Sequence, residues 1–388
     1  INFGLAGGAN VLVAQYWGKG EPAEIRKVLS IVYRISVCIS LLFSLGALCC
    51  PEIIMSIFTN DAEVIAAGCR YLTVIGWVYP LYALGNNTIM LLRAVGTVRI
   101  SLVVYSTSFV VNAFFNWVFI FGNLGAPRLE IQGAALATAI ARVVEFLIVA
   151  WFLFRREHKI QFRLHDLRRF DRVMFGAFVR AATPIIFNDM IWAIGNSMIT
   201  IIMGRMGKEF VAANSINSVV MQFASVALMG TSSAAAAIIG NTIGAGEYDR
   251  ARDRARTLMY IAAMIGVAAG VLIFTIRPFI LGFYNITEVT RSYAMSFMAI
   301  TSVLVFFMAQ SSVSMMGTLR GGGDGKFVMV IDVIFMWMIC IPLGYIAGLR
   351  LGLAAPIVYF IIKCDEMIKS VIGAVRVYRG RWIRDMTV

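Results

Sequence analysis

The sequence predicts an all-α polytopic membrane protein, and three observations carry this prediction. Of its 388 residues, 60% are hydrophobic and only 14% are charged, whereas soluble domains average about 45–50% apolar and about 25% charged residues. Apolar stretches of about 20 residues, the length that crosses a bilayer as a helix, recur along the chain. The clearest of them occupy residues 28–50, 71–92, 100–121, 131–154 and 257–276. The third observation is where the basic residues lie.

Lys and Arg gather on alternate loops. With eleven spans, 22 of the 34 Lys and Arg fall on one side of the membrane, 7 on the other and 5 within spans. Cytoplasmic loops carry such an excess, so we expect a cell inner (plasma) membrane protein whose basic side, with the C-terminus, faces the cytoplasm. This placement accounts for the net charge of +13, and no nucleic-acid partner is expected.

The two halves of the chain carry related patterns. "AQYWGKGE" ends at Glu21 and "GNTIGAGE" ends at Glu247, an offset of 226 residues, and "LLRAVGTVR" and "TLRGGGDGK" follow at an offset of 227. Six spans separate the two G-x-G-E copies, so both halves cross the membrane in the same sense, as parallel repeats do. Their glycines are expected to end one helix and turn the chain into the next.

The repeat also predicts the boundaries. We expect an N-terminal lobe in residues 1–154, a basic cytoplasmic linker in 155–172 and a C-terminal lobe in 173–388. If each lobe has six helices, the first lobe lacks its first helix here, and eleven helices are expected in this chain.

Several separate motifs resemble the multidrug and toxic compound extrusion (MATE) family. After the G-x-G-E bend come "NAFFNWVFIFG" and "QGAALATAIARVVE", and the second half carries "TPIIFNDMIWAIG", "LRGGGDGK" and "YRGRWIRDMT". The resemblance runs from the family's second helix to its twelfth. It implies two six-helix lobes forming a V, and a secondary active exporter of amphipathic or cationic organic compounds against H⁺ or Na⁺. We expect no enzymatic activity, no cofactor beyond the coupling ion, and a monomer in the lipid bilayer.

Asp189 is the first candidate for cation or substrate binding. A charge inside a span costs roughly 2.5–3.5 kcal/mol on insertion scales and needs a reason. Asp189 follows Asn188, and Pro184, just over one turn earlier, is an expected hinge. A carboxylate in an apolar cavity can hold a proton near neutral pH, and the resemblance implies a cation-binding acid here. A buried Asp satisfied by a neighbouring helix is the alternative, and no metal is expected beyond a possible Na⁺ near Asp189.

Two charged pairs at helical spacing are further candidates. Lys363 and Glu366 are three residues apart and are expected to pair on one helix face, with Asp365 beside them. Arg142 and Glu145 repeat the arrangement in the first half. Each pair either holds the inner ends of the helices together or forms an inner gate.

The remaining candidates are one acid and three amides. Asp332 lies near the start of its helix, where the helix dipole stabilises a carboxylate, or it takes part in gating. Asn112 and Asn116 share one helix face, and they and Gln310 either bond across helices or line the cavity. Residues 306–316 hold no acid, although sodium-coupled members of the family often carry one there, so the coupling ion stays open, with protons mildly favoured.

Three other functions are less well supported by the sequence. A lipid-linked saccharide flippase of related fold should have a strongly basic central cavity. An intramembrane enzyme should show a motif such as H-E-x-x-H or G-x-S-x-G, and neither occurs. A channel should show a selectivity ring rather than two inequivalent lobes.

Overall fold

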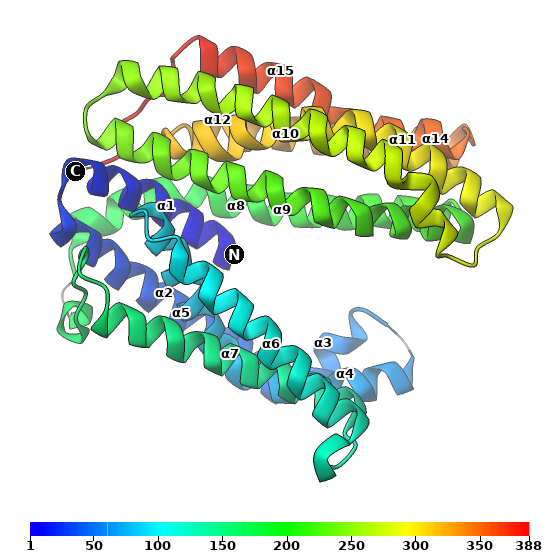
Figure 1. Cartoon of the computed structure of the whole chain (residues 1–388), viewed down its shortest axis with the longest axis horizontal. Helices are drawn as coiled ribbons and strands as arrows, with labels where there is room; N and C mark the ends of the chain where they lie inside the picture. The colour runs from blue at the N-terminus through cyan, green and yellow to red at the C-terminus, as the bar shows by residue number, and fades with distance from the viewer. Residues whose placement is uncertain (60, 169, 388) are drawn as a thin grey trace. The chain divides into compact units, whose positions relative to one another are not determined.

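The computed structural model describes residues 1–59, 61–168 and 170–387, and within them every regular element is helical (Figure 1). Nine helices there are long and apolar enough to cross a membrane. Two further helical segments, the shorter α1 and the consecutive pair α14 and α15, give the described residues the eleven helical segments that the sequence predicts. The predicted all-α membrane fold is confirmed.

The elements follow one another with short connections. The first part of the chain forms α1 (Asn2–Lys19), α2 (Pro22–Cys49), α3 (Pro51–Ser56), α4 (Ala62–Ile75), η1 (Gly76–Val78), α5 (Tyr79–Ala94), α6 (Arg99–Phe121), η2 (Asn123–Gly125) and α7 (Glu130–Arg155). The rest forms η3 (Leu164–Arg168), α8 (Arg172–Arg205), α9 (Lys208–Gly244), α10 (Tyr248–Gly282), α11 (Glu288–Ser311), η4 (Ser312–Leu319), α12 (Gly325–Val333), η5 (Ile334–Cys340), α13 (Ile341–Tyr345), η6 (Ile346–Arg350), α14 (Ala355–Lys363) and α15 (Asp365–Tyr378).

Contacts divide the chain into two compact units. The C-terminal unit comprises Ile1, Asn10–Gly20 and the chain from Val179 onward, and the N-terminal unit comprises Asn2–Ala9 and Glu21–Phe178. In the C-terminal unit, α9, α10 and α11 pack side by side, and in the N-terminal unit α6 packs on α7 and α2 on α5 (Figure 1). The aromatic centre of the C-terminal unit is the Phe297 ring, which stacks on Tyr359 with 4.4 Å between centroids.

The two G-x-G-E patterns form equivalent corners. Gly20 and Gly246 both adopt φ of 76°, the left-handed conformation that closes a helix, and α2 and α10 start within two residues of them. The expected turns are confirmed. The glycine two residues earlier in each pattern has another role. A Cβ on Gly18 would lie 2.0 Å from the Asn241 carbonyl oxygen, and one on Gly244 would lie 1.9 Å from that of Gln15.

This close contact respects the sequence repeat. The offset of 226 that relates Gly18 to Gly244 also relates Gln15 to Asn241. Gly18 packs against Asn241, and its equivalent Gly244 packs against Gln15, so the two contacts are equivalent. The crossing of α1 and α9 is therefore self-complementary, like an interface across a two-fold axis. Small residues four apart let two membrane helices approach to backbone contact.

Gly244→Val is expected to disrupt this crossing, at a cost above about 3 kcal/mol, because the obstacle is backbone that cannot rotate away. Gly246→Asn is the matched control, since nothing lies within 4 Å of its Cβ position and Asn tolerates the left-handed conformation. Folded yield by size-exclusion chromatography measures both variants. Equal yields would contradict a packing role for Gly244.

The C-terminal tail folds back onto α1. The buried Gln15 amide donates to the Arg384 carbonyl at 3.0 Å and accepts from the Met386 N–H at 2.7 Å. Lys19 pairs with Asp385 at 3.2 Å, and the Trp382 side chain is fully buried. The "YRGRWIRDMT" stretch thus ties α1 to the end of the C-terminal unit.

The basic linker packs on α2 within the N-terminal unit. Arg26 donates to the Ile160 carbonyl at 2.9 Å, and Lys27 pairs with Asp171 at 3.1 Å. The Met174 N–H and the Lys27 ammonium hold the pKa of Asp171 below its usual value, because both stabilise the carboxylate. Position 169 of the predicted linker lies outside the described residues.

Candidate cation and substrate site

The first contact of the site joins α8 to the end of η4. Asp189 is 17 residues after the first residue of α8 and 16 before its last, so it lies midway along the helix. Arg320 donates to Asp189 Oδ1 at 3.2 Å, and their side chains are 13% and 26% exposed. The predicted candidate Asp189 therefore has a charged partner that the sequence did not indicate.

Asn188 extends the site to α12. Its side-chain amide donates to Asp332 Oδ2 at 3.0 Å, and the other carboxylate oxygen of Asp332 lies 3.5 Å from Lys369 Nζ. Asn188 is 2% exposed, and its amide oxygen contacts no hydrogen-bond donor within the described chain. Asp332 is thus a link between α8 and α15 and not only a residue near a helix N-terminus.

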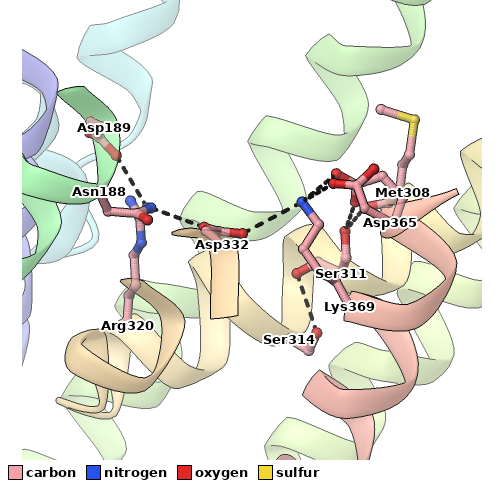
Figure 2. Close-up of polar contacts among 10 residues, drawn as sticks. Asn188, Asp189, Met308, Ser311, Ser314, Arg320, Asp332, Asp365 and Lys369 are labelled. Atoms are coloured by element: carbon pink, nitrogen blue, oxygen red, sulfur yellow. Dashed lines mark hydrogen bonds and ion pairs between the residues drawn. The ribbon is translucent and has the colours of Figure 1, made fainter. Parts of the chain in front are cut away.

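Lys369 is the centre of the second part of the site. Its ammonium lies 2.8 Å from Asp365 and 3.0 Å from Glu366, and the Ser311 hydroxyl donates to Glu366. The Lys369 side chain is only 5% exposed. Figure 2 shows these contacts as a series in two parts, Arg320 with Asp189 and then Asn188 with Asp332, Lys369 and Asp365, and the two parts are joined only because Asn188 and Asp189 are neighbours on α8. We call this series the charge network.

The expected pairing of Lys363 with Glu366 is wrong. α14 ends at Lys363 and α15 begins at Asp365, and among the described residues Lys363 forms no ion pair with Glu366. Glu366 and Asp365 contact Lys369 instead.

Wide π-helical turns flank the network. Ser311 immediately precedes η4 and Arg320 immediately follows it, while Asp332 lies two residues before η5, and both η4 and η5 are π-helical. A π turn contains one residue more than an α-helical turn, so the side chains on either side of it point in different directions from those of a regular helix. Such turns are frequent at functional sites. They have no signature in the apolar pattern.

The charges of the network do not balance. Four carboxylates, those of Asp189, Asp332, Asp365 and Glu366, face two cations, Arg320 and Lys369. Fully ionised, these six groups carry a net charge of −2, and Lys363, which forms no ion pair among the described residues, acts on Asp365 and Glu366 only at longer range. An uncompensated charge inside the membrane is costly, so the arrangement favours uptake of a proton or another cation.

The candidates of the N-terminal unit form contacts of their own. Arg142 pairs with Glu145, as expected, and its guanidinium lies 5.2 Å from the Tyr82 ring centre. Asn116 donates to Asn112 at 3.0 Å, and Asn112 donates across to Thr138 of α7 at 3.3 Å. Asn112 therefore bonds across helices, and Asn116 bonds to Asn112 within α6.

Gln310 and Pro184 complete the predicted set. Gln310 of α11 donates to the Met259 carbonyl of α10 at 3.0 Å, which is again a bond across helices. α8 runs without interruption from Arg172 to Arg205 through Pro184, so the predicted hinge lies inside a continuous helix. Pro184 lines a cavity of about 90 Å³, together with Arg180, Arg320, Lys326 and Arg384.

A bundle of membrane-length helices with buried, linked charges at the middle of its spans is typical of secondary transporters. The MatE family model matches residues 1–118 and 184–346. The chain therefore belongs to the MatE family of membrane transporters, which confirms the family resemblance and the expectation that the protein is not an enzyme.

The chain is similar to bacterial members of this family. It is 23% identical to "Uncharacterized transporter YisQ" of Bacillus subtilis, over 98% of this chain and 83% of that protein. It is 24% identical to "Probable multidrug resistance protein YoeA" of the same organism, over 89% of this chain and 75% of that protein. Its fold matches a solved outward-facing multidrug resistance MATE family transporter with a TM-score of 0.88 and 17% identity, covering 98% of this chain and 85% of that one.

Proposed function

We propose that this protein is a proton-coupled antiporter that exports amphipathic, often cationic organic compounds. The observation that carries the proposal is the charge imbalance of the network, with four carboxylates against two cations. A proton bound there neutralises part of the excess, and its release to the cytoplasm restores it. We propose further that the protein acts as a monomer in the inner (plasma) membrane, with its C-terminus in the cytoplasm.

The contacts around Lys369 support a way for protonation to reach α8. Lys369 faces three carboxylates at once. A proton on Asp365 or Glu366 weakens one of these ion pairs, so the ammonium interacts more strongly with Asp332. Asp332 also accepts from Asn188, the neighbour of Asp189 on α8. Protonation at α15 thereby alters the contacts that hold the middle of α8, where the substrate is expected to bind.

The position of Lys369 favours H⁺ over Na⁺ as the coupling ion. Its ammonium lies 2.8 Å and 3.0 Å from two carboxylates, which is the place that a sodium ion would need to occupy to be bound by those oxygens. Sodium would have to displace a buried lysine, whereas a proton needs only one carboxylate oxygen.

A lipid-linked saccharide flippase is the second candidate, and one observation favours it. The cavity beside Pro184 is lined by Arg180, Arg320, Lys326 and Arg384, and arginine binds phosphate groups well. Its volume of about 90 Å³ is far below the roughly 300–1,000 Å³ of ligand pockets. Arg320 and Arg384 also already pair with Asp189 and Asp324. We therefore favour the exporter.

Ethidium transport in vesicles containing the purified protein tests the proposal. We expect efflux driven by a pH gradient alone and little efflux driven by a sodium gradient alone. Efflux driven by sodium but not by pH would assign the other coupling ion, and dependence on neither gradient would refute antiport.

A further inference from the structure

An apolar groove lies between α8 and the end of the rod that contains α13 and η6. It has a volume of about 720 Å³ and is lined by hydrophobic side chains such as Met198, Ile201, Ile346 and Leu349. All of its lining residues belong to the C-terminal unit. The groove is at the ends of these rods farthest from the basic linker, because α8 starts at the linker and ends at Arg205.

Two arginines are among the residues that line the groove. Arg205 is the last residue of α8, Arg350 is the last residue of η6, and both line the groove. Both side chains are exposed, and among the described residues neither has an ion pair, a hydrogen bond or a ring contact. By contrast, Arg320, Arg376 and Arg384 of the same unit are all paired with aspartates.

These arginines are also unusual in their distribution. The side of the membrane to which they belong holds only 7 of the 34 Lys and Arg, and two of these 7 line the same groove. An arginine at a helix end can simply extend its side chain into water. That explanation does not account for the fact that Arg205 and Arg350, which are 145 residues apart in the chain, line the same apolar groove.

We propose that this groove binds an anionic phospholipid of the leaflet opposite the basic face, with one acyl chain in the groove and the phosphate between Arg205 and Arg350. The volume of the groove lies within the roughly 300–1,000 Å³ of ligand pockets. Guanidinium groups bind phosphate oxygens through paired, charge-assisted hydrogen bonds. Basic pockets between membrane helices bind anionic headgroups elsewhere by the same chemistry.

The lipid would join α8 to the rod that carries η5 and η6. Arg205 is 16 residues from Asp189, about 24 Å along the helix, so the lipid site is separate from the charge network. It holds the far end of the same helix. A bound lipid is therefore expected to stabilise the C-terminal unit by mass action without contributing to ion binding.

The test compares lipids of equal acyl chains but different headgroups. The purified protein in detergent is titrated with phosphatidylglycerol, phosphatidylcholine or inorganic phosphate, and binding is followed by native mass spectrometry and by the thermal unfolding midpoint. We expect phosphatidylglycerol to bind at least about tenfold more tightly than phosphatidylcholine, a difference of about 1.4 kcal/mol. Inorganic phosphate is expected to give no stabilisation, because it cannot fill the groove.

The double variant Arg205→Gln/Arg350→Gln is expected to lose this preference while unfolding at the same temperature as the wild type in phosphatidylcholine. Arg70→Gln, an exposed arginine of the same side of the membrane that does not line the groove, is the matched control and should keep the preference. Equal binding of both lipids by the wild type, stabilisation by phosphate alone, or a preference retained in the double variant would overturn the proposal.

Discussion

Asp189→Asn is expected to lower ethidium efflux driven by a pH gradient by about 10- to 100-fold. Asparagine carries no negative charge for a cationic substrate, and it leaves the Arg320 guanidinium, 13% exposed, without its carboxylate. A hydrogen bond to a charged group is worth roughly 1.5–3 kcal/mol, and each 1.36 kcal/mol changes a rate about tenfold. Initial efflux rates at matched protein levels measure the effect.

A second variant separates the two possible roles of Asp189. If Asp189 serves only to neutralise Arg320, then Asp189→Asn/Arg320→Gln removes both charges together and efflux recovers. If Asp189 takes part in coupling, the double variant folds but stays inactive, which is the outcome we expect. Full pH-driven efflux by Asp189→Asn alone would remove Asp189 from the mechanism.

Lys369→Gln is expected to destabilise the protein more than any other single substitution in the network. It removes the ammonium that forms an ion pair with each of Asp332, Asp365 and Glu366. Removing one partner of a buried ion pair typically costs about 3–5 kcal/mol. The thermal unfolding midpoint in detergent should fall accordingly, and efflux should be lost.

The charge count suggests both a rescue and a control. Adding Asp365→Asn to Lys369→Gln removes one of the unpaired negative charges and should recover part of the lost stability, though not transport. Lys363→Gln removes a lysine from the same rod, one residue before the break at Cys364, and should change the midpoint little. An equal loss from both lysine variants would contradict the assignment of Lys369 as the central cation.

The membrane fold and the corner turns could be predicted because they depend on short-range signals. An apolar stretch of bilayer length becomes a helix irrespective of its neighbours, and α6 at Arg99–Phe121 differs from the predicted 100–121 by one residue. The glycine turns followed from local backbone preferences at Gly20 and Gly246. The acids of the network were also visible, since a charge in an apolar span stands out.

The partners of those acids could not be predicted. Arg320 is not a candidate from the sequence, yet it follows η4 directly and donates to Asp189. The helical period places both Lys363 and Lys369 three residues from Glu366, and the structure pairs Glu366 with Lys369. Spacing along one helix allows Glu366 either lysine, and it carries no information about contacts between helices, such as Arg320 with Asp189.

Proton release on substrate binding tests the central claim most directly. Ethidium is added to the purified protein in weakly buffered detergent solution, and the pH change is recorded for the wild type and for Asp189→Asn, with ethidium binding followed in parallel by fluorescence. Linkage requires that a ligand which competes with a proton displaces it. We predict release of about one proton per bound ethidium by the wild type and much less by the variant. Ethidium binding by the wild type with no proton release would contradict proton-coupled antiport through the charge network.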